Sequence, residues 1–527
     1  MTKTQQAEDV TEAHILTSEF KDIDDTPVSK TELRAWYLFG MGADPISFCQ
    51  GISPSHRFFL PLIVERLAAD GGFTAADHTV PCDPSVAGYS CVVPVGGAWM
   101  DTSSFYFMTV VVSTILQLIL FIGMGSIADH GPYRKKFMLG FSVLGSICCI
   151  LFMAIIQKTN YWFSAVLTIL VGVALGSAWV FNYAFIPPLA RNHPDFLEVA
   201  KTPGVTRERL LAKLDEVTNY ISSISFVYMY GGTLVLLVVI VGLNFVLPVP
   251  DSFPSNYAYH VGVGLGGLIW LIGIFIAWKE MRDRPGPAFP EGENVVLFST
   301  KKVFSAISQA RKLQNLFLFL IGWFCYSDGL ATLIAATVLW ANDELGFTSK
   351  EILILAAEVP ILALIGSWLW NKAQVKFRIP SKTMLLIQNT VYTLIVLWGW
   401  LGFTNAGLGY KTKIELYAAA TLHGLLLGGT QSTCRALFGQ LLPAGHESKF
   451  FALYEIVDKG SAWIGPLVIA AIRTSGTNKS FEFVFLTAQF VVGLVLFSRV
   501  DVFAGVEEGK LFGAAEREKE ESRKNIA

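Results

Sequence analysis

Gly125-Ser126-Ile127-Ala128-Asp129-His130-Gly131-Pro132-Tyr133-Arg134-Lys135-Lys136 is a short, charged stretch with two glycines, and it lies between two apolar runs, 105–124 and 137–156. Each run is long enough to cross a bilayer as a helix, because about 20 residues rising about 1.5 Å each match a hydrocarbon core of roughly 30 Å. The stretch is therefore expected to be a tight basic turn between two membrane-spanning helices, on the cytosolic side.

The composition of the whole chain also indicates an integral membrane protein. Of 527 residues, 53% are apolar and only 16% are charged, whereas about 25% are charged in a typical soluble domain. The net charge of -2 gives no reason to expect a nucleic acid or an acidic ligand. Residues 1–35 are polar and lack the features of a secretory signal, so the first span is expected to direct the chain to the membrane.

Apolar runs predict about twelve membrane spans and hence an all-α integral membrane protein. The spans are expected to begin near Leu38, Phe105, Phe137, Phe163, Ile221, Val261, Leu316, Ile352, Met384, Leu416, Phe450 and Phe483. This arrangement predicts a cytosolic polar tail at 1–35, an N-terminal six-helix half at 36–280, a cytosolic linker at 281–315, a C-terminal six-helix half at 316–500 and a cytosolic tail at 501–527.

Basic residues set the expected orientation, because they gather in alternate loops. By the positive-inside rule these loops face the cytosol, and both termini then face it too. The residues are Arg134, Lys135, Lys136, Arg191, Lys201, Arg207, Arg209, Lys213, Lys279, Arg282, Arg284, Lys301, Lys302, Arg311, Lys312, Lys372, Lys376, Arg378 and Lys382.

The opening stretch resembles the signature loop between the second and third helices of major facilitator transporters, where a Gly, an Asp four residues later and a basic cluster recur. The hydrophilic linker 281–315 separates six expected spans from six, which suggests a parallel internal repeat of the two halves. In agreement, Gly172-x-x-Leu175-Gly176 in the fourth span recurs as Gly424-x-x-Leu427-Gly428 in the tenth. Small residues one turn apart are also typical of helix packing in membranes, which is the alternative interpretation.

Motifs for catalysis and for nucleotide or metal binding are missing from the sequence. There is no Gly-x-x-x-x-Gly-Lys-Ser/Thr loop to bind a nucleotide phosphate, so transport energy is expected to come from a gradient. The eight histidines show no metal-ligand spacing, and no nucleophile elbow occurs. We therefore expect no enzyme activity, no cofactor and no metal.

Two acids fall within predicted spans, where charged side chains are costly and usually functional. Asp328 lies near the centre of the seventh span beside Gly329, and Glu358 lies in the eighth. Both are expected to face a central cavity as sites for substrate or a coupling ion. The alternative is a structural acid that is neutralised by a neighbouring donor.

Four charged residues in the tenth and eleventh spans are predicted to meet in one network. Arg435 and Glu455 lie at a similar depth, each about 12 Å by helical rise from the turn 443–448. Glu455 and Lys459 are four residues apart and share one helix face, whereas Asp458 is expected to point elsewhere. Such ion pairs would break and re-form as the two halves rock, or else form a static latch.

Asp129 in the opening stretch has a related predicted role. It could sit at the N-terminus of the eleventh helix, near 448–451, where the helix dipole favours a negative charge. This contact would stabilise the state that is closed on the cytosolic side, and Arg134 is expected to take part in the same gating ion pairs. A solvated acid in a turn is the alternative.

The loop 70–101 lies on the non-cytosolic side and contains Cys82 and Cys91. Because that side is oxidising along the secretory route, we expect a disulfide between them, with two free thiols as the alternative. Asn478-Lys479-Ser480 is a candidate glycosylation site on the same side. The other five cysteines fall in spans and are expected to be packing residues.

Longer stretches resemble a narrower family, the fungal autophagy-related vacuolar effluxers, which are a branch of the major facilitators. The resemblance covers nearly the whole chain and rests on 428–438, 442–447, 450–466 and the shorter segments 32–38, 91–105, 187–194, 230–232, 284–290 and 322–329. It implies a transporter in the vacuole membrane that exports leucine and other neutral amino acids to the cytosol after autophagic breakdown during nitrogen starvation. Gln431, in the first of these stretches, is a further substrate candidate.

The first span departs from the family pattern at 50–57, where polar residues place Arg57 near membrane depth. Arg57 is therefore another substrate or coupling candidate, and a paralogue that moves another anion or metabolite is an alternative. A non-transporting membrane receptor or scaffold is a third interpretation. For the transporter we expect alternating access, and an acidic vacuole lumen could drive proton-linked export.

Overall fold

The computed structural model describes residues 24–50, 59–83, 90–157, 159–247, 253–254, 256–287, 289, 312–404, 407–474 and 478–526. Arg57 and most of the linker 281–315 lie outside these residues. The helices of the first part of the chain are α2 (Lys30–Gln50), α3 (Phe59–Asp70), α4 (Thr102–Met124), α5 (Tyr133–Leu151), α6 (Tyr161–Tyr183), α7 (Ile186–Arg191), α8 (Pro194–Ala200), α9 (Arg207–Val246) and α10 (Tyr257–Glu280).

The second part of the chain is also helical. Its helices are α12 (Gln314–Asp343), α13 (Ser349–Phe377), α14 (Ser381–Trp398), α15 (Lys413–Gln440), α16 (Glu447–Ser461), α17 (Ile464–Thr474), α18 (Phe481–Arg499) and α19 (Val502–Ile526). Two short 3-10 helices, Phe152–Ala154 and Gly399–Phe403, extend α5 and α14.

Eight helical segments in the described part of the chain are long and apolar enough to cross a membrane by length and composition. The other four expected spans correspond to α2 with α3, α13, α15, and α16 with α17. These carry more polar residues or are interrupted, which lowers their hydropathy. The eleventh span begins at Glu447, before the expected Phe450, and is broken between α16 and α17.

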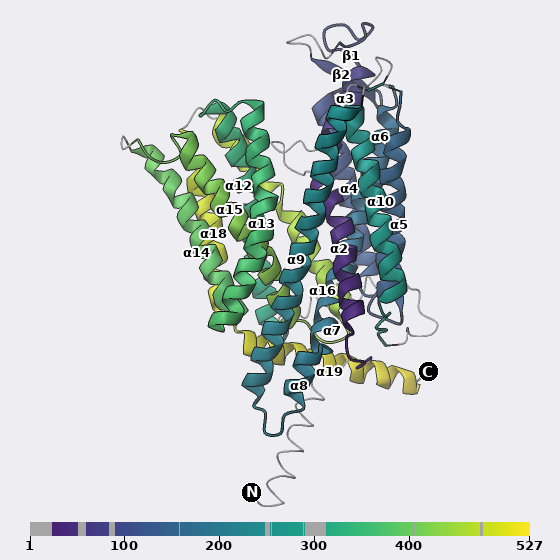
Figure 1. Cartoon of the computed structure of the whole chain (residues 1–527), viewed down its shortest axis with the longest axis vertical. Helices are drawn as coiled ribbons and strands as arrows, with labels where there is room; N and C mark the ends of the chain where they lie inside the picture. The colour runs from purple at the N-terminus through teal and green to yellow at the C-terminus, as the bar shows by residue number, and fades with distance from the viewer. Residues whose placement is uncertain are drawn as a thin grey trace, which may run out of the picture.

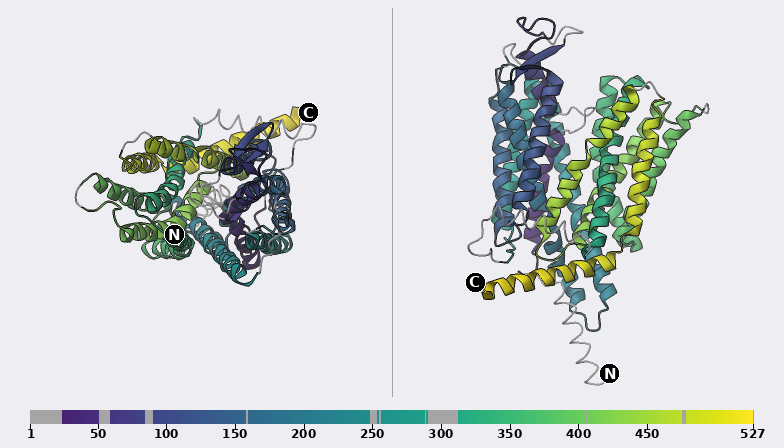
Figure 2. Two further views of the ribbon diagram at one scale, coloured as in Figure 1. Left: turned by 90° about the horizontal axis from the view of Figure 1, so that it is seen from above. Right: turned by 180° about the vertical axis from the view of Figure 1, so that it is seen from behind.

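The helices form two groups that meet at one end and diverge toward the other (Figure 1). α2 to α6 and α10 make up one group, α12 to α18 make up the other, and α9 runs between them. Figure 2 shows the same two groups from above and from behind. This is the all-α, two-half architecture that the sequence predicted.

The repeated glycines lie at equivalent helix contacts in the two halves. A Cβ atom on Gly172 or Gly176 of α6 would come within 2.2 Å of Ser113 or Gln117 of α4. On Gly428 of α15 it would come within 2.1 Å of the Ala363 carbonyl in α13. The fourth span thus packs closely on the second, as the tenth packs on the eighth, and the equivalence agrees with a parallel repeat.

The end where the two groups diverge carries a small antiparallel sheet of β1 (Phe73–Thr74), β2 (Cys91–Val95) and β3 (Ala98–Asp101), in that order. We call it the strand end. A disulfide joins Cys82 to Cys91, at the first residue of β2. Asn478 is exposed before α18, and its side-chain carbonyl accepts a hydrogen bond from the Ser480 N–H at 2.9 Å.

The Cys82–Cys91 disulfide closes an interval of nine residues, so it removes freedom mainly from the unfolded loop. Replacing both cysteines with serine is expected to destabilise the sheet by about 2–3 kcal/mol. Hydrogen exchange at the β2 amides measures this loss of protection. Cys325→Ser, at a free cysteine in α12, is the control, and unchanged protection in the double variant would contradict the prediction.

The opposite end, which we call the basic end, contains α7, α8, α19 and the turn between α4 and α5 (Figure 1). α19 lies across this end and contacts both halves. Glu507 pairs with Arg207 of α9 at 2.5 Å, while Glu508 accepts a 2.8 Å hydrogen bond from the Asn315 side chain of α12. The C-terminal tail is therefore a helix that bridges the two halves.

Candidate functional site

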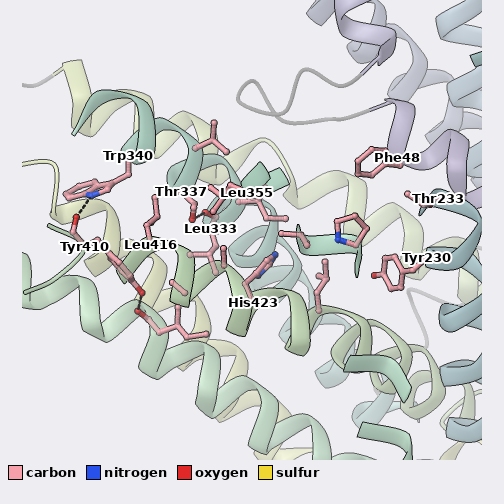
Figure 3. Close-up of a pocket in the computed structure, with 18 of the residues that line it drawn as sticks. Phe48, Tyr230, Thr233, Leu333, Thr337, Trp340, Leu355, Tyr410, Leu416 and His423 are labelled. Atoms are coloured by element: carbon pink, nitrogen blue, oxygen red, sulfur yellow. Dashed lines mark hydrogen bonds between the residues drawn. The ribbon is translucent and has the colours of Figure 1, made fainter. Parts of the chain in front are cut away.

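A cavity of about 320 Å³ lies between the two halves (Figure 3). One wall comes from α2 and α9 and includes Asp44, Ser47 and Thr233. The other wall comes from the second half and is mostly apolar, with Leu333, Leu355, Ile395, Leu416 and Phe483. We call it the central cavity.

A proline inside the continuous helix α2 explains how Asp44 is positioned. Pro45 lies inside α2 and has no N–H, so the carbonyl of Met41, one turn earlier, loses its helical partner. At this point α9 approaches closely, because a Cβ atom on Gly232 would lie only 2.0 Å from the Met41 oxygen. The neighbouring Thr233 then donates a 2.8 Å hydrogen bond to one Asp44 oxygen. Among the described residues none donates a hydrogen bond to the other oxygen.

The apolar wall is held rigid by buried aromatic residues. The Trp340 indole N–H donates to the Tyr410 carbonyl at 2.8 Å, and the Tyr410 hydroxyl donates to the Ile395 carbonyl at 2.5 Å. The phenol of Tyr230 and the imidazole of His423 project toward the space from opposite sides (Figure 3). The cavity can therefore take a ligand with one charged end and an apolar body.

Arg435 of α15 reaches across to the first half, but it does so through aromatic rings. Its guanidinium lies 4.4 Å from the ring centre of Tyr183 and 5.2 Å from that of Phe226, distances at which cation–π attraction acts. It also donates to the Gln431 side chain, whereas its buried Nε has no hydrogen-bond partner within the described residues.

The network expected among Arg435, Glu455, Asp458 and Lys459 is not formed in this structure. Within the described part of the chain, no ion pair of 4.0 Å or less joins any two of them. Glu455 is buried in α16, while Asp458 and Lys459 are half-buried. Arg435 does contact α16, but through the ring of Tyr454, whose centre lies 5.7 Å from the guanidinium.

Asp328 lies within the second half and is not among the residues that line the central cavity. It is buried, and one oxygen accepts a hydrogen bond from the Gly465 N–H at 3.2 Å. The other accepts from the Gln489 side chain of α18. Asp328 thus sits at the N-terminus of α17, where the eleventh span is interrupted and the helix dipole favours an anion.

Asp328→Asn is expected to lower stability while leaving transport by the folded protein within about twofold of normal. Asparagine keeps an acceptor oxygen but loses the charge, and hydrogen bonds to charged groups contribute about 1.5–3 kcal/mol. Thermal unfolding in detergent and efflux per folded molecule measure the two effects separately. Lost efflux at unchanged stability would instead give Asp328 the substrate role expected from the sequence.

Glu358 of α13 is half-buried beside the cavity wall, with Leu355 and Val359 of the same helix among the lining residues. Its carboxylate accepts a hydrogen bond from the Thr421 hydroxyl of α15. This contact joins two helices of the same half. Glu358 is not itself among the lining residues of the cavity.

A buried ion-pair network closes the basic end. The Asp129 carboxylate accepts hydrogen bonds from the backbone N–H groups of Ser448 and Lys449, at 2.7 and 2.9 Å, which is the contact with the eleventh helix that the sequence predicted. Arg134 donates to Asp129 at 3.2 Å and to Glu447 at 2.8 Å. Arg191 of α7 pairs with the other oxygen of Glu447. We call these four side chains the basic-end gate.

The charges of the basic-end gate depend on one another. Burial alone would raise the pKa of Glu447, but the positive charges of Arg191 and Arg134 outweigh it and hold this pKa at about 2. Burial raises the pKa of Asp129 above its ordinary value, although Arg134 and the two N–H groups act in the opposite direction. Glu447 is therefore the firmly ionised anion of the gate.

A second set of contacts joins the halves along α9. The Asp215 carboxylate accepts hydrogen bonds from the Ser381 N–H at the start of α14 (2.9 Å) and from the Gln440 side chain (2.6 Å). Nearer the middle, the Ser222 hydroxyl donates to the Ser432 carbonyl at 2.8 Å. These contacts also lie toward the basic end, so the structure is closed there.

Sequence reasoning missed Asp44, Glu447 and Arg191. Asp44 lies within the first predicted span, so the rule that selected Asp328 would also have found it. Arg191 and Glu447 are 256 residues apart, and no sequence pattern predicts their pairing. Among the described residues, no group of three or more His, Cys, Asp or Glu could hold a metal ion.

Comparisons with known proteins agree with this architecture. Residues 28–510 match the family model described as vacuole effluxer Atg22 like. Autophagy-related protein 22-1 of Penicillium rubens is 30% identical over an alignment of 563 positions, gaps included, that covers 93% of each chain. Among solved structures, the proton:xylose symporter XylE has a TM-score of 0.58 at 11% identity, with 90% of this chain and 97% of that chain covered. FucP in the outward conformation has a TM-score of 0.59 at 11% identity, with 90% and 99% covered. Both structures are major facilitator transporters.

Proposed function

Because this chain belongs to the family of Atg22-like vacuole effluxers, we propose that it exports neutral amino acids from the vacuole lumen to the cytosol. The amino acids are leucine and similar ones, released by autophagic breakdown during nitrogen starvation. The protein is a multi-pass membrane protein with a major facilitator fold. It acts as a secondary active transporter, and no part of the mechanism requires a nucleotide.

The make-up of the central cavity carries this proposal. A free amino acid has an ammonium group, a carboxylate and a side chain close together. The unpaired oxygen of Asp44 suits the ammonium group, while the apolar wall of the second half suits an aliphatic or aromatic side chain. Arg435 and Gln431 do not line the cavity in this structure, but the Arg435 Nε has no partner among the described residues, so the two are candidates to bind the carboxylate as the halves rock. Hydrogen-bonded charges of this kind fix orientation in a mostly apolar site.

The orientation follows from the distribution of charge. We assign the basic end to the cytosol, because basic loops stay on that side, and the strand end with its disulfide to the lumen. Both termini then face the cytosol. In this orientation the closed basic-end gate makes the structure a lumen-facing state, ready to bind substrate from the vacuole.

Export then requires the halves to rock about the central cavity. The basic-end gate separates, the strand end closes, and the substrate leaves toward the cytosol. Asp44 is the only acid that lines the central cavity among the described residues. It is therefore also our candidate for a proton site, through which an acidic lumen would drive export.

Efflux from proteoliposomes tests the proposed function. Vesicles are loaded with a mixture of amino acids at acidic internal pH, and release is compared with that from protein-free vesicles. We expect selective release of neutral amino acids with apolar side chains, faster than at equal pH on both sides. No release of any amino acid would refute the proposal and favour an exporter of another metabolite.

Vacuole contents provide the cellular test. Nitrogen-starved cells that lack the protein are expected to retain leucine in isolated vacuoles, and restoring the intact chain should lower that pool. Equal vacuolar leucine with and without the protein would place the transporter elsewhere or give it another substrate.

A further inference from the structure

A second cavity, of about 450 Å³, lies at the basic end, away from the central cavity. It is formed by α8 and α9 of the first half and by α13 of the second, and we call it the α9–α13 pocket. Its charged lining residues are Asp195 and Glu216 on one side and Lys372 and Lys376 on the other. The pocket therefore lies between the two halves and carries opposite charges on its two walls.

These charges face each other without meeting. Glu216 pairs with Lys213 of its own helix at 2.8 Å, and the Asp195 carboxylate lies 3.8 Å from the imidazole of His193. Lys372 lies over the Trp368 ring at 3.9 Å and Lys376 over the Phe377 ring at 5.4 Å. Within the described part of the chain, no ion pair joins a lysine of one wall to an acid of the other.

A buried donor on the lysine wall points to a missing partner. Asn371 is only 6% exposed and lines the pocket, and its Nδ2 has no hydrogen-bond acceptor among the described residues. Leaving such a group unsatisfied costs about 1–3 kcal/mol. An acceptor, such as a phosphate oxygen, would remove this cost and would sit beside the two lysines.

The surroundings of the pocket are those of a membrane interface. Trp368, Leu369, Val375 and Phe377 of α13 and Tyr220 of α9 are large apolar or aromatic residues that are more than one third exposed. Tryptophan and tyrosine gather at the level of lipid headgroups, and exposed apolar side chains next to them face acyl chains. A ligand of the pocket can therefore be a lipid with its head inside and its tails outside.

We propose that the α9–α13 pocket binds a zwitterionic phospholipid headgroup. The phosphate lies against Lys372, Lys376 and the Asn371 amide, and the headgroup ammonium lies between Asp195 and Glu216. The four charged side chains of the lining sum to zero, which matches a zwitterion, whereas an anionic headgroup would also meet two carboxylates. Because the lipid touches both halves at the closed end, it favours this conformation over one in which the halves separate there.

Lipid titration of the purified full-length protein tests the site. Phosphatidylethanolamine, phosphatidylglycerol and soluble phosphoethanolamine are added separately in detergent, and binding is measured by native mass spectrometry and by the shift in thermal midpoint. The K372A/K376A variant is expected to bind phosphatidylethanolamine at least about tenfold more weakly, which corresponds to about 1.4 kcal/mol. Lys279→Ala, at an exposed lysine outside the pocket, is the matched control and should bind normally.

A charge-altering variant separates this headgroup from its alternatives. D195N/E216Q neutralises the acidic wall, so the two lysines of the opposite wall are the charges that remain in the lining. This variant is expected to prefer phosphatidylglycerol. Melting in lipid-free detergent shows that each variant is folded. The proposal is overturned if neither double variant changes lipid binding, or if the wild type prefers phosphatidylglycerol. It is also overturned if soluble phosphoethanolamine binds as well as the lipid, because the ligand would then be a phosphate ester.

Discussion

Asp44→Asn is expected to reduce amino-acid efflux by about 30-fold or more while the protein stays folded. The substitution removes the carboxylate that faces the central cavity but keeps an oxygen that can accept from Thr233. Losing one member of a desolvated charge pair costs about 2–5 kcal/mol, and each 1.4 kcal/mol is a factor of ten. Initial efflux rates from proteoliposomes, divided by the amount of folded protein, measure the effect.

Two transport assays separate the roles that we propose for Asp44. If it binds the substrate ammonium, both net efflux and exchange of labelled for unlabelled amino acid are lost. If it carries only a proton, exchange continues and only pH-driven net efflux is lost. Thr233→Val, which keeps the carboxylate and removes its hydrogen bond, should have an intermediate effect. Normal rates of both processes in Asp44→Asn would exclude Asp44 from the transport site.

Glu447→Gln is expected to open the basic end. The substitution leaves Arg134 and Arg191 buried without the carboxylate that they share. Removing one partner from a buried ion pair costs about 3–5 kcal/mol. If the cost falls on the closed state alone, the ratio of closed to open molecules falls by roughly a hundredfold or more.

A reporter thiol at the contact of the two halves measures this change. Ser223 of α9 is buried against Ser432 of α15. Ser223→Cys, in a chain whose five free cysteines are replaced by serine, should react with thiol reagents only when the basic end opens. Glu447→Gln is expected to increase the labelling rate strongly. Glu507→Gln, at a partly exposed ion pair worth less than about 1 kcal/mol, is the control, and equal labelling in both variants would contradict the prediction.

The pKa of Glu447 gives the pH dependence of the same contact. A carboxyl whose pKa is lowered from 4.5 to about 2 in the folded protein stabilises the closed gate fully above about pH 4.5. The stabilisation is lost as the pH falls from 4.5 toward 2. We therefore expect the same labelling rate of Ser223→Cys at pH 7 and pH 5, in the same background with Glu447 intact, once each rate is divided by that of the unfolded protein at the same pH to cancel the loss of thiolate. A faster normalised rate at pH 5 would show that another group of the gate titrates.

The sequence was most informative where a property depends on local pattern. Apolar length predicted the spans, and the charged turn after α4 predicted both a major facilitator fold and the position of Asp129. It was least informative about partners distant in the chain. Arg435 was expected to pair with Glu455 because the two share a depth, but depth does not determine which side-chain atoms meet. In this structure the Arg435 guanidinium lies against the rings of Tyr183, Phe226 and Tyr454, the last of which is the neighbour of Glu455 in α16, without an ion pair.

Asp44 and Asp328 illustrate a different limit. Both are acids within predicted spans, and hydropathy treats them alike. Their backbone environments differ: Pro45 removes one hydrogen bond from the continuous helix α2 beside the central cavity, whereas the break between α16 and α17 leaves the Gly465 N–H to donate to Asp328 inside one half. Tertiary packing determines which acid lies beside Pro45 and which lies beside the start of α17. A single sequence does not reveal this packing.

α9 has a mechanical consequence for the transporter. Its 40 residues span about 60 Å at 1.5 Å per residue, well beyond a bilayer that is about 40–45 Å thick with its headgroups. It touches Asp44 through Thr233 near the middle and α19 through Arg207 at its outer end. A stiff helix with this geometry acts as a lever. A small tilt of α9 at the level of the cavity produces a larger sideways displacement of its end outside the membrane. A fluorescent probe on the protruding end would then report, from the aqueous side, what happens within the bilayer.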